Sequence, residues 1–141
     1  MTKQETKERL LGVRRAQAEA ERYAALKRQA KDLACRATRP ADQLPGGSGK
    51  GNDVFARYAQ YADELDVRIA ALLAARRTAV EEISRLSDSR YRELLLGYYV
   101  QGLTWERVAE EMGYTYQNVV QFLHPKALTA MSEVFEKESN I

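Results

Sequence analysis

Hydrophobic residues recur along this chain at spacings of three and four, the pattern of helices that bury one face. The most regular run extends from about Asp53 to Leu86. Sustained over several heptads, it predicts a coiled coil, formed either by folding back on an earlier helix or with a second chain. Its inward positions are Phe55, Tyr58, Ala62, Leu65, Ile69, Leu72, Arg76, Ala79, Ile83 and Leu86. Arg76 interrupts this seam, where it either faces a glutamate of the partner helix or extends its stem along the core.

A first long helix is predicted from Lys3 to about Thr38, a segment rich in Ala, Arg, Glu and Lys without proline. Its apolar stripe is thin, so this helix needs a partner. The stripe consists of Leu10, Val13 and Ala20, followed by a shifted set of Tyr23, Leu26, Ala30, Leu33 and Ala37. Its many cations favour a solvated face over a role at a DNA backbone. They include Arg14, Arg15, Lys27, Arg28 and Lys31.

The two long helices are separated by residues 39–52, which contain Pro40, Pro45 and a run of glycines. This composition predicts a flexible connector. A phosphate-binding loop is not expected, because Leu44 stands where that pattern requires glycine and no strand precedes it. The chain is therefore expected to divide into a helical hairpin at 1–86 and a second domain at 87–141.

A third helix is predicted after a cap at Ser87 or Asp88, ending near Gly102. Its apolar positions are Tyr91, Leu94, Leu95, Tyr98 and Tyr99. The tyrosines are expected to be core residues whose hydroxyl groups act as anchors.

The segment from Leu103 to Leu128 has the spacing of a helix-turn-helix, and the preceding helix would cover its apolar faces. Thr104 can cap the first helix, and Gly113 supplies the left-handed turn. The buried face of that helix is predicted to be Trp105, Val108, Ala109 and Met112. In the second helix, Val119 and Phe122 are expected to pack back onto the first.

The outward positions of the second helix are candidate DNA contacts, because Asn and Gln can pair with adenine and hydroxyl groups can reach phosphates or base edges. These positions are Thr115, Tyr116, Gln117, Asn118 and Gln121, with His124 and Lys126 as further contacts. No Asp or Glu occurs between Met112 and Ser132, so phosphate would not be repelled here. The alternative is that these helices only form part of a helical bundle.

Pro125 removes a backbone donor and should clash with the carbonyl of residue 121 in a continuous helix. A kink or a restart is therefore expected, followed by a final amphipathic helix. The apolar face of that helix would be Ala127, Leu128, Met131, Val134 and Phe135. His124 has no plausible acid-base partner nearby and is expected to contact phosphate or a helix end.

The net charge of +2 conceals an asymmetry between the two ends. Residues 1–40 hold 11 Lys or Arg against 5 Asp or Glu, whereas residues 93–141 hold 3 against 7. Nonspecific DNA affinity comes from cations that neutralise phosphates. Because the region of the motif is acidic, additional phosphate contacts are expected from elements outside it.

Several function classes are not expected. The single Cys35 excludes an internal disulfide and, with one histidine, a zinc site, so it is predicted to be buried or interfacial. The charged start and the absence of a long apolar run predict a cytoplasmic protein without a membrane partner. No cofactor and no enzymatic activity are expected, because no nucleophile-base pair, carboxylate dyad or metal spacing is present.

Together these motifs resemble small proteins of phages and prophages in Gram-positive bacteria whose C-terminal halves are similar to sigma factor region four. The resemblance is carried by Leu86-Ser87-Asp88, Tyr91-Arg92, Leu94-Leu95, Tyr98-Tyr99-Val100, Trp105-Glu106, Val108-Ala109, Met112-Gly113-Tyr114, His124 and Ala127-Leu128. Such proteins are described as domains of unknown function or as phage transcriptional regulators of the ArpU and RinA kind. The resemblance implies control of phage genes through the outward residues of the motif.

The expected protein is therefore all-α, with a long N-terminal hairpin or coiled coil followed by a helix-turn-helix bundle. Its expected function is sequence-specific binding of double-stranded DNA in transcription regulation, as a dimer joined through the long helices. The alternatives are a phage DNA-packaging recognition subunit of the small terminase kind and a protein-binding adaptor acting on RNA polymerase.

Overall fold

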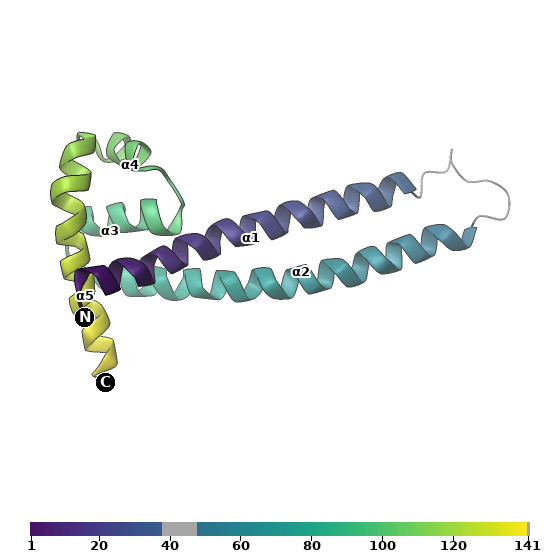
Figure 1. Ribbon diagram of the computed structural model, residues 1–141, viewed down its shortest axis with the longest axis horizontal. Helices are drawn as coiled ribbons and strands as arrows, with labels where there is room; N and C mark the ends of the chain where they lie inside the picture. The colour runs from purple at the N-terminus through teal and green to yellow at the C-terminus, as the bar shows by residue number, and fades with distance from the viewer. Residues whose placement is uncertain (38–47, 141) are drawn as a thin grey trace. The chain divides into compact units, whose positions relative to one another are not determined.

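The computed structural model describes the backbone of residues 1–37 and 48–140, and the side chains of 1–37 and 53–140. Every regular element in these ranges is helical, which confirms the all-α prediction (Figure 1). The elements are α1 (Lys3–Ala37), α2 (Ser48–Ile83), α3 (Ser89–Leu95), η2 (Leu96–Val100), α4 (Trp105–Met112), η3 (Asn118–Leu123) and α5 (His124–Ser139). The segments η2 and η3 are π-helical. Within the described ranges, no helix is long and apolar enough to cross a membrane.

The contacts divide the chain into two compact units, and the division falls within the two long helices. Unit 1 combines Met1–Ala18 with Leu73–Ile141, and unit 2 is Glu19–Leu72. The sequence instead suggested a boundary after residue 86. The ends of both long helices thus pack with the C-terminal helices, because Leu10, Ala79 and Ile83 belong to the same buried cluster as the motif.

Unit 2 consists of parts of α1 and α2 that run side by side (Figure 1). Its described buried apolar residues are mostly alanines: Ala20, Ala34, Ala62 and Leu65. An ion pair of 2.8 Å joins Lys27 to Asp66 across the two helices. These contacts show that the second helix folds back onto the first within one chain, which is one of the two arrangements that the sequence left open. The connector prediction at 39–47 lies outside the described residues, and α2 already begins at Ser48.

The predicted apolar stripe of the first helix is wrong in unit 2. Leu26 and Leu33 of the predicted stripe are exposed, and Ala34, outside it, is buried; Ala20 is buried as predicted. The reason is that small side chains line the side of α1 facing α2, which turns the larger leucines outward. Cys35 is also exposed in the single chain, so burial within the chain is wrong, and an interfacial position stays a prediction.

The seam predicted for the second helix is confirmed over most of its length. Ala62, Leu65, Ala79, Ile83 and Leu86 are buried in their respective units. Phe55, near the start of the helix, is exposed instead.

Arg76, in unit 1, does not face a glutamate. Its guanidinium donates a hydrogen bond of 3.3 Å to the side-chain oxygen of Gln17 on α1. The polar position in the seam is thus satisfied by an uncharged partner.

Two arginines of α1 fix the base of the hairpin in unit 1. Arg14 donates hydrogen bonds to the carbonyl oxygens of Tyr98 at 2.5 Å and Leu103 at 3.0 Å. Arg9 pairs with the buried carboxylate of Glu82 at 2.6 Å and lies over the Phe135 ring. Arg14 is therefore an anchor for the segment before the motif, and the prediction of a solvated face fails at this position.

Candidate nucleic-acid interface

The helix before the motif supplies its support. Asp88 caps α3, accepting a hydrogen bond of 2.9 Å from the backbone N–H of Arg90. Leu94, Leu95 and Tyr99 on α3 and η2 are completely buried. Gly97 lies so close to α4 that an added Cβ would be 3.3 Å from the side chain of Val108. A side chain larger than glycine at position 97 would therefore crowd Val108 and disturb the packing of α4 on η2.

An aromatic cluster lies beneath the motif. The Tyr98 ring stacks on Trp105 with centroids 3.8 Å apart, and the Arg14 guanidinium lies 4.0 Å from the centre of the Tyr98 ring. The hydroxyl of Tyr99 shares a hydrogen bond of 2.6 Å with Nε2 of His124. The prediction that these tyrosines are core residues with hydroxyl anchors is confirmed for Tyr99.

The first helix and the turn follow the sequence prediction. Thr104 caps α4 by accepting a hydrogen bond from the N–H of Arg107 at 3.2 Å. Gly113 ends α4 in the left-handed region, with φ of 75°. The N–H groups of Gly113 and Tyr114 bond to the carbonyls of Glu110 and Ala109, so the turn is a Schellman motif.

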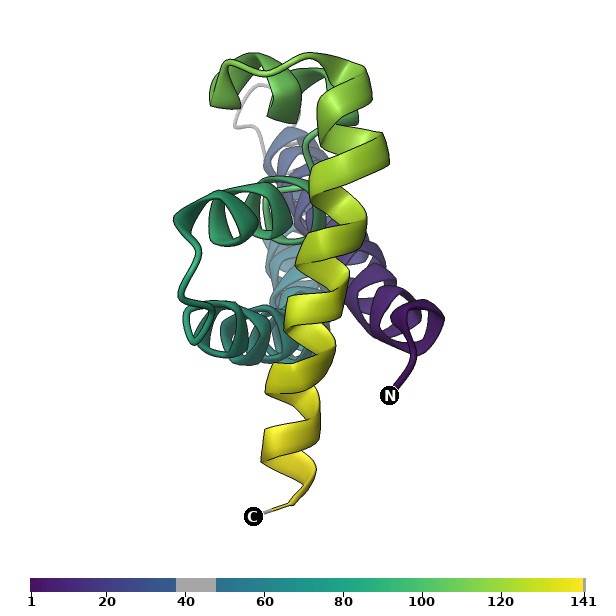
Figure 2. The same cartoon turned by 90° about the vertical axis from the view of Figure 1, so that its left-hand side faces the viewer.

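A second helix begins at Tyr116 and continues through η3 into α5 (Figure 2). Thr115 caps it, since its Oγ1 accepts a hydrogen bond of 3.2 Å from the N–H of Asn118. The sequence predicted Thr115 as a DNA contact. In the structure its hydroxyl oxygen caps the second helix.

Pro125 stands in the first turn of α5, as the predicted restart requires. The preceding backbone is also helical, and the N–H of His124 bonds to the carbonyl of Val119, five residues back. The helix therefore does not break before Pro125. Its backbone hydrogen bonds change from the π pattern in η3 to the α pattern in α5. This wider turn is a place where a helix can tolerate the missing N–H of proline.

The π-helical turn decides which residues of the second helix are buried. Val119 is completely buried as predicted, but Phe122 is 58% exposed and Leu123 is buried in its place. The prediction for Phe122 was wrong because a π-helical turn contains more residues than an α-helical turn, so the inward position moves from 122 to 123.

His124 lies in the interior, with only 7% of its surface exposed, and its ring is 4.5 Å from that of Trp105. The prediction that it contacts DNA is therefore wrong, because Tyr99 and Trp105 enclose the imidazole. Burial, and to a smaller extent the charge of Lys7, lowers the pKa of His124 to about 4. Burial also raises the pKa of Tyr99.

The exposed side of the second helix is termed the outer face and consists of Tyr116, Gln117, Gln121, Phe122 and Lys126. Asn118, at its edge, is half-buried. Within the described part of the chain, the side-chain amides of Gln117, Asn118 and Gln121 make no hydrogen bond. The outer face therefore presents unused donors and acceptors beside exposed rings.

Charges near the outer face come from different elements. A hollow of about 360 Å³ is lined by Lys3 of α1 and by Lys126 and Glu133 of α5. On α4, Arg107 pairs with Glu111 at 3.3 Å and lies 3.8 Å from Glu110. The amines of α1 and α5 are thus near one another, while the carboxylates on α4 are partly compensated.

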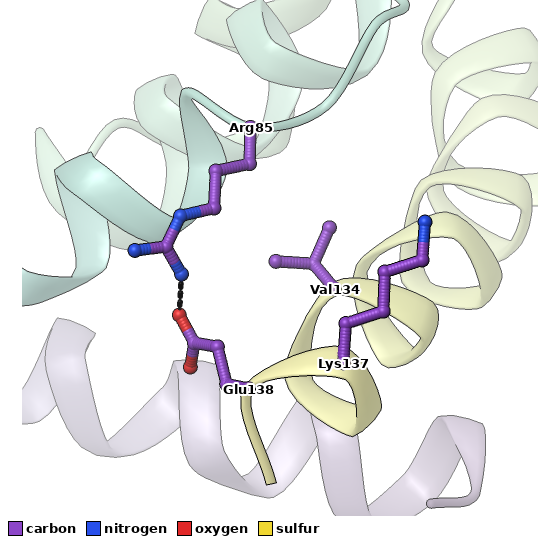
Figure 3. Close-up of a pocket in the computed structure, with 4 residues that line it drawn as sticks. All are labelled: Arg85, Val134, Lys137 and Glu138. Atoms are coloured by element: carbon purple, nitrogen blue, oxygen red, sulfur yellow. Dashed lines mark hydrogen bonds and ion pairs between the residues drawn. The ribbon is translucent and has the colours of Figure 1, made fainter. Parts of the chain in front are cut away.

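A larger cavity, of about 540 Å³, lies between Arg85, in the turn after α2, and Val134, Lys137 and Glu138 of α5 (Figure 3). Arg85 is paired with Glu138 across it. The cavity lining contains no nucleophile with an adjacent base. Among residues 1–37 and 53–140, no group of three or more His, Cys, Asp or Glu side chains is placed to hold a metal ion.

No family model, curated protein or solved structure matches this chain.

Proposed function

We propose that this chain is a sequence-specific DNA-binding regulator whose outer face enters the major groove of duplex DNA. The observation that supports the proposal most strongly is the combination of exposed amides at Gln117 and Gln121 with a buried opposite side at Val119 and Leu123. A rigidly packed helix can hold amide groups at defined positions, and Asn or Gln can form bidentate bonds with adenine.

The electrostatics of the outer face also support contact with DNA. No carboxylate occurs between residues 112 and 132, and Lys126 is exposed on the same helix. Lys3 could add a phosphate contact from the start of α1, beside Lys126. This arrangement would supply part of the backbone affinity that the acidic C-terminal region lacks.

The resemblance to phage and prophage regulators extends the proposal to transcription control in a bacterial host cell. The sigma-like pattern adds RNA polymerase as a further partner. We also propose a dimer, so that two motifs read two half-sites of one operator. Since the long helices pair within each chain, the dimer would join two hairpins side by side.

Selection of bound sequences from a random pool of duplex DNA tests the proposal, together with the Gln117→Ala and Asn118→Ala double variant. The full chain should enrich one sequence. The double variant should lose about 10-fold or more in affinity for that sequence and bind random duplex as before, because each bidentate pair contributes about 1 to 3 kcal/mol of discrimination. Gln60→Ala, an exposed glutamine of α2, is the matched control and should behave like the wild type.

The alternative functions give different outcomes in the same experiment. Failure to enrich any duplex at low salt would reject DNA recognition and favour the adaptor that binds RNA polymerase. A ring of many chains, measured by light scattering, would favour the packaging subunit. Unchanged affinity of the double variant for the enriched duplex would remove Gln117 and Asn118 from base recognition.

A further inference from the structure

Phe122 is the most exposed aromatic residue in unit 1, although the neighbouring apolar positions Val119 and Leu123 are buried. Two other exposed aromatics of this unit, Tyr114 and Tyr116, belong to the same motif. Single exposed hydrophobic residues are common on protein surfaces. Here three of them gather on the turn and second helix, which indicates a surface that contacts another molecule.

The exposure of Phe122 is built into the backbone. The π-helical turn from Asn118 to Leu123 shifts the inward position to Leu123, and Pro125 follows immediately. Below this turn, His124 is held by its hydrogen bond to Tyr99. Phe122 is therefore held outward by the backbone, and it directly follows the exposed Gln121 in the sequence.

The side chains of Gln121 and Phe122 have the chemistry that suits an A·T base pair. In the major groove, adenine presents a donor and an acceptor that suit Gln, and thymine presents a C5-methyl group that suits an apolar side chain. Gln121 and Phe122 are adjacent, and Gln117 lies one turn away, about 6 Å along the helix axis. The outer face thus exposes both amide groups and the apolar ring of Phe122.

We propose that Phe122 contacts the C5-methyl group of a thymine in the major groove, so that the chain prefers A·T pairs at this position. This inference rests on the proposed DNA-binding function and adds the class of base that is read. The duplex is favoured over a protein partner because the neighbouring polar groups are amides and a lysine, with no carboxylate in the same stretch.

The test compares the duplex enriched from the random pool with the same duplex in which every thymine is replaced by uracil, which lacks only the methyl group. Wild type should bind the uracil duplex about 4-fold more weakly for each methyl group that it touches in the thymine duplex. Phe122→Ala should bind both duplexes with equal affinity. Phe122→Leu, which keeps an apolar side chain, should retain part of the preference for thymine.

Phe55→Ala is the matched control, because Phe55 is an exposed phenylalanine of unit 2. It should keep the full preference for thymine. Equal binding of both duplexes by wild type, or an undiminished preference in Phe122→Ala, would overturn the proposed methyl recognition while the Gln117 and Asn118 result still decides DNA recognition. Absence of any enriched duplex would overturn both proposals.

Discussion

Both units of this chain contain parts of α1 and α2, but they differ in the size of the side chains that they bury. In unit 1, apolar side chains from α1, α2, α3, η2, α4, η3 and α5 form one buried cluster that includes Tyr99 and Phe135. In unit 2, the described buried apolar residues are three alanines and one leucine, while Leu33, Phe55 and Val67 remain exposed. The comparison shows that two long helices can pair through a few small side chains, whereas a core of large buried side chains requires several elements packed together.

Comparable leucine substitutions in the two units should give the largest difference. Leu95→Ala in unit 1 should lower the free energy of unfolding by about 3 kcal/mol, because it leaves a cavity in a filled core. Leu33→Ala in unit 2 should change it by less than about 0.5 kcal/mol, because Leu33 is 63% exposed. Denaturant unfolding followed by far-UV circular dichroism reports the helices of both units, and the fluorescence of Trp105, the only tryptophan, reports unit 1 alone. Equal losses in both variants would remove the contrast between the units.

Acid should destabilise unit 1 through His124. Since burial lowers its pKa to about 4, the unfolded chain takes up a proton between about pH 6.5 and pH 4 that the folded chain does not. The stability contribution is complete above about pH 6.5 and is lost as the pH falls to about 4, by up to about 3 kcal/mol. Unfolding curves for wild type and His124→Gln across this range measure the difference.

The sole imidazole gives a direct control, because its NMR signals can be followed without overlap from another histidine. A folded-state titration near pH 6.5 would contradict a buried, neutral His124.

The anchor between α1 and the segment before the motif should have a smaller effect. Arg14→Ala should cost about 2 kcal/mol, because it removes charged hydrogen bonds to the carbonyls of Tyr98 and Leu103. The adjacent Arg15→Ala is the control, since Arg15 is exposed and lies 4.0 Å from Glu8. Thermal unfolding should separate the two variants. A destabilisation by Arg15→Ala equal to that by Arg14→Ala would mean that general charge, and not the anchor, stabilises unit 1.

The caps and turn of the motif could be predicted from sequence because they depend on local geometry. Thr104, Gly113 and Val119 take the expected roles because capping and left-handed backbone restrict a few neighbouring positions. The heptad pattern likewise predicted a coiled coil for the second long helix, although it left open whether that helix folds back on the first or pairs with a second chain.

The remaining features depend on contacts between distant residues. Helical spacing allows either residue 122 or 123 to follow Val119 inward, and only the π-helical turn selects Leu123. The burial of His124 depends on Tyr99, which is 25 positions away. Arg14 and Arg15 look alike in sequence, and their roles differ because only Arg14 reaches the carbonyls near the motif.

The most direct test of DNA recognition by the outer face is NMR mapping of backbone amides in the full chain as the enriched duplex is added. The largest shifts should fall at residues 116–122 and near Lys126, with residues 19–37 and 53–72 unchanged. Shifts confined to the cations of α1, such as Arg28 and Lys31, would contradict the account, because DNA would then bind the hairpin and not the motif.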